Sequence, residues 1–188
     1  MENYTWPNPS CSFEPITEIC HAIGVININW AWCETVHEEL IADYLRIDWR
    51  IMSRITNTMP NRSRSELLEA LATEYYPDPM RRASVLHFVR WFDITRENRN
   101  LLTHSPLVIE TPENGGPFFS QARAGVEIRH RSIPVTAELL ISVCDETERL
   151  YEFGAAIVDS YIPGTPHSLP DRFPLPRKLS LLHPAQIT

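Results

Sequence analysis

The chain has 188 residues, of which 43% are hydrophobic and 22% are charged, and its formal net charge is −7. These values suit one globular domain with a substantial core, and the negative charge argues against a broad nucleic-acid-binding surface. No apolar run approaches the roughly 18 residues of a membrane span, and the first residues lack the features of a signal peptide. We therefore expect a cytoplasmic protein that does not contact a membrane.

The N-terminal third predicts a loose arm followed by two helices. Residues 1–12 contain two prolines and no periodic pattern, which is typical of an arm. From 13 to 46 apolar residues recur at helical spacing and predict a long first helix, in which Gly24 marks a bend or a close helix contact. A shorter helical pattern starts near Trp49 and stops before Pro60.

Capping residues predict where the next two helices begin. Ser63 and Glu66 have the spacing of a capping box, with Ser63 as the N-cap of a third helix. Asp78 and Pro79 have the pattern of an N-cap followed by a proline in the first turn. The fourth helix should then run to about His104, because the proline two residues later disfavours helical geometry in the residue between them.

The stretch from 107 to 131 predicts a small antiparallel hairpin. Residues 114–117 (Asn-Gly-Gly-Pro) are a turn signal, and we expect them to join strands at 107–109 and 126–131.

A last long amphipathic helix is predicted from 134 to about 161. The remaining residues, 162–188, contain six prolines and predict a tail that is disordered or wraps over the surface. The fold class is therefore mainly α: an antiparallel helical bundle over 13–161, with long first and last helices and a hairpin inserted before the last one.

Charge is distributed unevenly among these helices. Residues 79–104 carry five arginines against two acids, whereas 13–46 and 134–161 each carry six acids against one arginine. One interpretation is pairing between helices of the bundle. The other is a local anion site, where Arg96 and Arg99 meet His104.

One face of the predicted fourth helix changes from apolar to polar toward its C-terminus. At about 100° per residue, its apolar stripe continues through Arg96, Arg99 and Thr103. Asn100 and His104 flank this stripe, one turn apart. A core-facing surface that becomes polar is costly unless it opens into a cleft or an interface. The apolar part of the stripe consists of Val85, Phe88, Val89 and Phe92.

These side chains have the chemistry for cleaving RNA without a metal. Arginine offers a fixed fork of donors to a phosphate, and histidine titrates near neutrality. Together they can activate a ribose 2′-OH, bind the phosphate and protonate the leaving 5′-oxygen, which gives a 2′,3′-cyclic phosphate. The structural alternatives are that Arg99 pairs with Glu34 or another acid of the first helix, that Asn100 only packs, and that His104 caps the helix.

Arg99-Asn100-x-x-x-His104 resembles the R-N-x-x-x-H signature of the HEPN superfamily (higher eukaryotes and prokaryotes nucleotide-binding domains). The arrangement of residues 15–161 is similar too, with aromatics and a glutamate on the first helix and the motif late on another helix. The resemblance implies a helical bundle that forms a homodimer, in which two motifs make one metal-independent RNase site. Arg99 would then bind the phosphate, His104 would be the general acid and base, and Asn100 would orient either of them.

Arg96, Thr103 and Glu34 are the supporting candidates at this site. Relatives implied by the resemblance include ribonuclease toxins that a partner neutralises and forms that have lost catalysis. The sequence therefore predicts an endoribonuclease of toxin or phage-defence type, with RNA as substrate and an antitoxin or regulatory protein as partner. The alternative is a non-catalytic helical dimer that binds a partner or a nucleotide.

No cofactor or metal is expected. The four cysteines form no Cys-x-x-Cys pair, and His37-Glu38-Glu39 lacks the second histidine of a zincin helix. With six glycines in the whole chain, no phosphate-binding glycine loop is recognisable.

Overall fold

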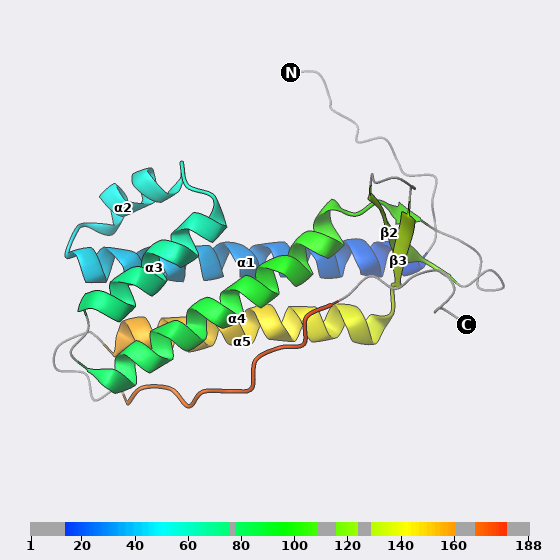
Figure 1. Cartoon of the computed structure of the whole chain (residues 1–188). Helices are drawn as coiled ribbons and strands as arrows, with labels where there is room; N and C mark the ends of the chain where they lie inside the picture. Colours follow the sequence, from blue (N-terminus) through cyan, green and yellow to red (C-terminus); the bar gives the residue numbers. More distant parts are fainter. Residues whose placement is uncertain (1–13, 76–77, 109–115, 124–128, 161–167, 180–188) are drawn as a thin grey trace, which may run out of the picture.

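A computed structural model of the chain describes residues 14–75, 78–108, 116–123, 129–160 and 168–179. In Figure 1 the long helices α1, α4 and α5 form the body of the molecule, with α2 and α3 toward one end and the sheet at the other. This mainly α bundle, with a small sheet before its last helix, confirms the predicted fold class. The helices are α1 (Glu14–Leu45), α2 (Trp49–Thr56), α3 (Asn61–Tyr75), α4 (Pro79–His104) and α5 (Ala137–Asp159). The strands are β1 (Leu107–Val108), β2 (Phe118–Arg123) and β3 (Arg129–Pro134).

Helix α4 begins and ends where its sequence predicts. The Asp78 side chain accepts a hydrogen bond from the backbone N–H of Met80 (2.9 Å), and Pro79 occupies the first turn. At the other end Ser105 has extended geometry (φ −92°, ψ 135°), as expected for the residue before a proline. The candidate motif therefore lies in the last two turns of a helix whose limits are set by local chemistry.

The predicted capping box of α3 is wrong. The helix begins at Asn61, directly after Pro60, whose carbonyl accepts a hydrogen bond from the N–H four residues later (3.1 Å). Ser63 is therefore already inside the helix and cannot be its N-cap. Glu66 instead accepts a hydrogen bond from Arg62 Nε at 2.9 Å, as an i, i+4 ion pair on the exposed face.

A small antiparallel sheet lies before the last helix as predicted, but it has three strands, in the order β1-β2-β3, where two were expected. Strand β2 pairs with both neighbours, with Leu107 opposite Phe119 and Phe119 opposite Ile133. The turn signal at 114–117 thus precedes β2, and the sequence missed β2 because Phe118–Arg123 does not alternate cleanly. Of the expected second strand, 129–131 belong to β3, and 126–128 lie outside the described residues.

Two buried clusters hold the bundle together. The larger one joins all five described helices, and Phe88 and Phe92 of α4 are completely buried in it. The smaller one joins the first half of α1 to the end of α4, the sheet and the start of α5 through Ile26, Phe119 and Val143. Because the smaller cluster includes Leu101 and Leu102, it fixes the end of α4 that carries the motif. No described helix has the length and apolarity needed to cross a membrane.

The close helix contact expected at Gly24 occurs instead at Gly154 of α5. A Cβ at Gly154 would lie 2.5 Å from Val36 Cγ1 and 2.6 Å from Phe88 Cε2, whereas one at Gly24 would meet nothing within 4 Å. The missing side chain of Gly154 thus lets α5 approach α1 and α4 closely.

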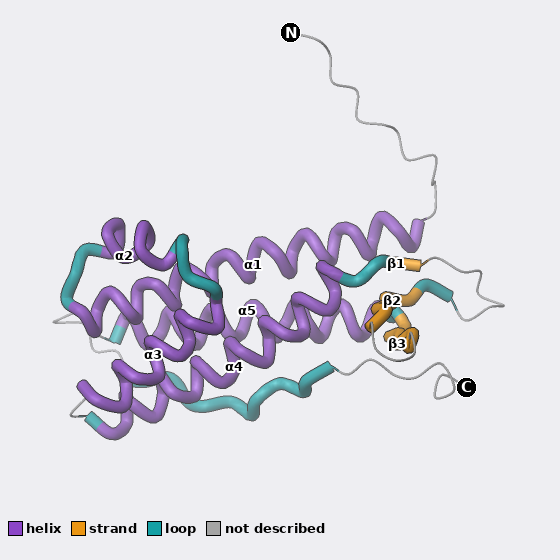
Figure 2. The backbone as a smooth tube through the Cα atoms, turned by 45° about the horizontal axis from the view of Figure 1, so that its top comes forward, coloured by secondary structure: helices purple, strands orange, loops and turns teal. Residues whose placement is uncertain are grey.

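Residues 168–179, hereafter the strap, run in an extended path along α4 and α5 (Figures 1 and 2). The strap is the part of the predicted tail that the structure describes. Of the two alternatives expected for the tail, disorder or wrapping over the surface, the strap follows the second. The predicted arm over 1–12 and the residues 162–167 and 180–188 of the tail lie outside the described residues.

Candidate functional site

Arg99 is half-buried and points to helix α1, where its partner is an amide. Its Nε and Nη2 both donate to Oδ1 of Asn27, at 3.1 and 2.7 Å. The Nδ2 of Asn27 donates to the carbonyl of Ile23 (2.8 Å), which fixes the amide with its oxygen toward Arg99. The guanidinium is thereby held in one orientation by a neighbouring helix.

A second amide completes this arrangement. Nη1 of Arg99 donates to Oδ1 of Asn100 (3.0 Å), and the Thr103 hydroxyl donates to the Arg99 carbonyl (3.0 Å). Three of the five guanidinium N–H groups are thus used, one on each nitrogen, and two remain. Both partners are neutral, and Arg99 forms no ion pair with any described residue. The positive charge of Arg99 is fixed in place without being neutralised.

His104 is the last residue of α4, and it is exposed. Its imidazole makes no hydrogen bond and no ion pair within the described ranges, so the structure does not support a capping role. An exposed imidazole at a helix C-terminus is accessible to a substrate.

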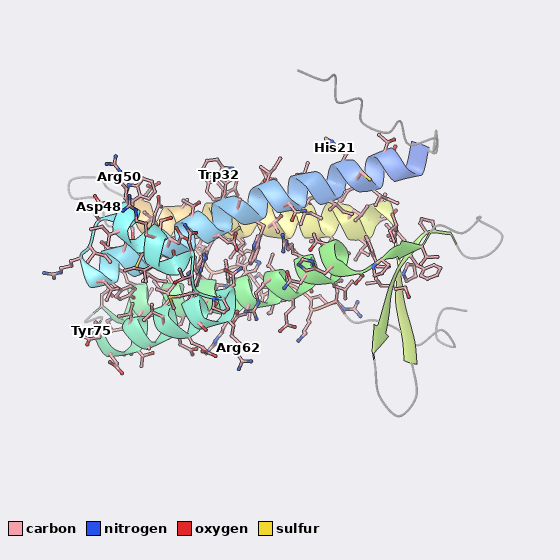
Figure 3. The ribbon with its side chains drawn as sticks, turned by 90° about the horizontal axis from the view of Figure 1, so that it is seen from above. His21, Trp32, Asp48, Arg50, Arg62 and Tyr75 are labelled. Atoms are coloured by element: carbon pink, nitrogen blue, oxygen red, sulfur yellow. The ribbon has the colours of Figure 1, made fainter. Side chains whose placement is uncertain are left out.

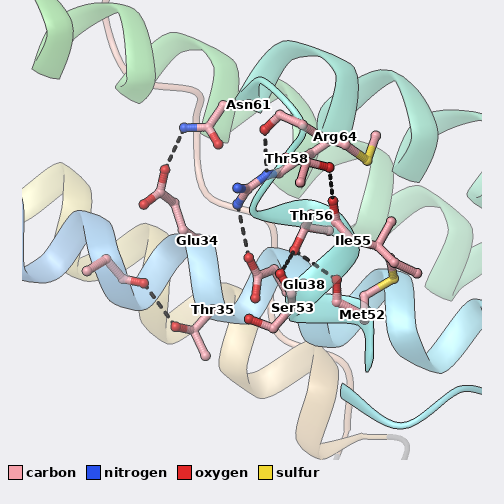
Figure 4. A network of polar contacts seen from close by, with 12 residues as sticks. Glu34, Thr35, Glu38, Met52, Ser53, Ile55, Thr56, Thr58, Asn61 and Arg64 are labelled. Carbon is pink, nitrogen blue, oxygen red and sulfur yellow. Dashed lines mark hydrogen bonds and ion pairs between the residues drawn. The ribbon is translucent and has the colours of Figure 1, made fainter. Parts of the chain in front are cut away.

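Glu34 does not lie against Arg99. It accepts a hydrogen bond from Asn61 Nδ2 on α3 (2.6 Å), as Figure 4 shows, beside the ion pair of Glu38 with Arg64 (3.1 Å). The structural alternative in which Arg99 pairs with Glu34 is therefore wrong, and Glu34 acts in joining α1 to α3.

Arg96 is also engaged away from Arg99. Its Nη2 lies 3.4 Å from Oδ1 of Asp93, which in turn accepts from the Ser65 hydroxyl of α3 (3.1 Å). The structure thus brings Arg99, Asn100 and Thr103 together, and it leaves Arg96 in a separate network.

The buried line of α4 departs from the predicted stripe after Phe92. It continues through Thr95, Asn98 and Leu102, all at most 1% exposed, rather than through Arg96, Arg99 and Thr103. Arg99 therefore lies at the border of the core, half-buried, because α1 covers one side of it.

Two functional candidates were missed from the sequence. Asn27 gave no signal, because a single amide on an amphipathic helix is ordinary. Asn98 could have been found, since it lies three residues after Thr95 and four before Leu102, at the spacing of buried positions. A polar side chain in such a position needs hydrogen-bond partners, and Asn98 has them on the strap and in Glu146 of α5.

No protein-family model, no curated protein and no solved structure matches this chain. Within the described ranges, no three His, Cys, Asp or Glu side chains gather in a way that could hold a metal ion. What the arrangement itself offers is a fixed, uncompensated guanidinium and an exposed imidazole in the last two turns of one helix. Such a pair can bind a phosphate and transfer a proton.

Proposed function

We propose that this protein is a metal-independent endoribonuclease of the HEPN type. The observation that carries the proposal is the state of Arg99: two neutral amides fix its guanidinium, and no carboxylate of the residues that the structure describes neutralises it. A half-buried charge of this kind favours binding of an anion, and the two unused N–H groups match two phosphate oxygens. The exposed His104 of the same helix supplies the group that exchanges protons.

The reaction divides into two proton transfers. A neutral imidazole takes the proton of the ribose 2′-OH, whose oxygen then attacks the phosphorus. The bond from phosphorus to the 5′-oxygen breaks, and a protonated imidazole gives its proton to that oxygen. Products are a 2′,3′-cyclic phosphate and a 5′-hydroxyl. Arg99 stabilises the charge that develops on the phosphoryl oxygens.

Since base and acid act on opposite sides of the phosphate, two copies of His104 serve the reaction better than one. We therefore include a homodimer in the proposal, with one motif from each subunit. Helix α1 offers apolar surface for a second copy, because Ile28 and Trp32, one turn apart, are 62% and 54% exposed (Trp32 is labelled in Figure 3). Cytoplasmic location and an antitoxin or regulatory partner belong to the same proposal.

The direct test is cleavage of RNA in the presence of EDTA. We expect the wild type to cleave, and Arg99→Ala and His104→Ala to lose about 10²-fold to 10⁴-fold in rate. Matched controls are Arg90→Ala, an exposed arginine of the same helix, and His21→Ala, an exposed histidine of α1 (Figure 3). Equal rates for all five proteins would contradict the assignment of these residues, and loss of activity with EDTA would contradict the metal-independent mechanism.

A second substrate separates catalysis from mere binding. RNA with a single 2′-deoxy nucleotide lacks the nucleophile and should be spared at that position, while products elsewhere should end in cyclic phosphates. If the wild type binds RNA through Arg99 and cleaves none of it, the non-catalytic binding module is the better assignment.

A further inference from the structure

The strap is held on α4 by a buried amide. Nδ2 of Asn98 donates to the carbonyl of Arg177 (3.0 Å), and the N–H of Leu179 donates to Oδ1 of Asn98 (2.8 Å). Between these two residues, Lys178 forms an ion pair with Glu97. The side chain of Asn98 thus pairs with the backbone of the strap as a neighbouring β-strand would. It donates to one strap carbonyl and accepts from one strap N–H.

Farther along, an aromatic pair fastens the strap to the bundle. The ring of Phe173 meets that of Trp91 edge-on, with centroids 6.3 Å apart and planes at 72°. This contact and the Asn98 anchor hold the strap at two places along α4. Between the strap and α5 they leave an open cavity of about 520 Å³, which lies within the usual size range of small-molecule sites.

The wall of this cavity that α5 provides is acidic. Glu138, Asp145 and Glu146 line it, and Arg149 is the one basic residue among its described lining residues. Glu146 is partly buried and accepts only long hydrogen bonds, from Asn98 Nδ2 (3.3 Å) and the Ser142 hydroxyl (3.4 Å). It forms no ion pair with a described residue. Its burial raises its pKa, which a bound positive charge would counteract.

The opposite wall is aromatic and apolar. Trp91 lines the cavity, is 2% exposed, and has an indole Nε1 with no hydrogen-bond partner among the described residues. Phe173 of the strap lines this wall too, and Ile141 adds an apolar side chain on the α5 side; both are more than half exposed. Rings attract cations through their faces, and apolar side chains accept an alkyl stem.

We propose that this cavity binds an organic cation in which an ammonium or guanidinium group is carried on a short aliphatic stem. The stem lies against Ile141 and the rings of Trp91 and Phe173, and the charged group faces Glu146 and Asp145. A free polyamine and a lysine or arginine side chain of a peptide share this chemistry. Because the strap forms one wall, the cation also holds the strap on the bundle. This site is separate from the Arg99 motif and does not depend on the proposed nuclease activity.

Calorimetric titration of the full chain tests the proposal, with butane-1,4-diamine as the cation and butane-1,4-diol as its neutral analogue. We expect the diamine to bind at least about tenfold more tightly than the diol, since only the diamine forms charge pairs. N-acetyl-lysine amide serves as the peptide-like probe, and the tighter of the two cations indicates the source of the ligand. Equal affinity for diamine and diol, or no binding of either cation at millimolar concentration, would overturn the proposal.

Substitutions on α5 test where the diamine binds. Glu146→Gln should lower the affinity for the diamine by about tenfold. The control is Glu152→Gln, which changes an exposed acid of α5 outside the cavity and should leave that affinity unchanged. If Glu146→Gln fails to fold, Asp145→Asn on the exposed face makes the same test. Arg149→Ala should tighten binding a few-fold by removing a like charge, an effect that misfolding cannot produce. Unchanged affinity in all these variants would place the cation elsewhere and refute the proposed site.

Discussion

Asn27 of α1 accepts two hydrogen bonds from Arg99 of α4, at 2.7 and 3.1 Å, across 72 positions of the chain. A carboxylate in that place would hold the guanidinium equally well and would also neutralise it. The amide separates the two effects, because it orients the cation and leaves its charge available to a phosphate.

The first prediction follows from that separation. Asn27→Asp keeps an acceptor for Arg99 and adds a negative charge, but it loses the hydrogen bond from Nδ2 to the Ile23 carbonyl. We expect RNA cleavage to fall at least about tenfold, while the new ion pair offsets the lost hydrogen bond in the free energy of unfolding. The control is Asn29→Asp, which makes the same charge change two residues away on α1. Cleavage rates and urea denaturation measure the two effects. A variant that cleaves RNA as fast as Asn29→Asp would show that the neutrality of the Asn27–Arg99 contact is unimportant.

A second prediction concerns the anchor of the strap. Asn98→Ala removes the side-chain partners of Arg177 and Leu179 from a buried position, and we expect it to cost about 1–3 kcal/mol of unfolding free energy. Lys178→Ala removes a more exposed ion pair and should cost less than about 1 kcal/mol. Amide hydrogen exchange at Leu179 should become faster in Asn98→Ala before the helices are affected. If the two variants lose the same stability, Asn98 is not the main anchor.

The two helical glycines make a matched pair for a third prediction. Gly24→Ala should stabilise the protein by about 0.5–1 kcal/mol, because alanine favours the helix and a Cβ at Gly24 meets nothing within 4 Å. The same change at Gly154 should destabilise it by about 1–3 kcal/mol, since the Cβ would collide with Val36 and Phe88. Thermal denaturation of both variants measures the contrast, and a change of equal sign in both would contradict the packing described here.

The fourth prediction is a pH dependence of stability that comes from His37. This residue is fully buried against the rings of Phe88 and Phe92, and neither ring nitrogen has a hydrogen-bond partner in the described part of the chain. Burial, reinforced by the charge of Arg64, lowers its pKa from 6.5 to about 3. Between these values the unfolded chain binds a proton that the folded chain does not. The free energy of unfolding should therefore fall as the pH drops below about 6.5, by up to about 1.4 kcal/mol per pH unit.

Replacing this histidine with an apolar residue isolates its contribution. His37→Leu should keep its stability near pH 7 and lose part of the decrease between pH 6.5 and pH 4, measured by urea denaturation at several pH values. His21→Leu changes an exposed histidine and should leave the profile as in the wild type. A profile in His37→Leu that matches the wild type would show that other groups cause the pH dependence.

Helix α4 is the element whose limits the sequence predicted correctly. Its start at Pro79 and its end at His104 follow from neighbours in the chain, and both were predicted. Strand β2 was missed, because its residues do not alternate and its pairing with β1 and β3 is decided across the sheet. The start of α3 was placed wrongly at Ser63, since two residues nearby can both begin a helix and only the folded chain selects one.

The sequence by itself determined the helical bundle, the limits of α4 and the place of Arg99, Asn100 and His104 at its end, because these depend on apolar periodicity and on contacts between near neighbours. Only the tertiary structure decided what surrounds them. That Arg99 meets an amide and not Glu34, and that Asn98 is paired with the strap, depends on how helices and tail approach one another over long sequence distances. Such pairings leave no periodic trace in the chain, since any of several polar side chains on α1 was a suitable partner for the arginine.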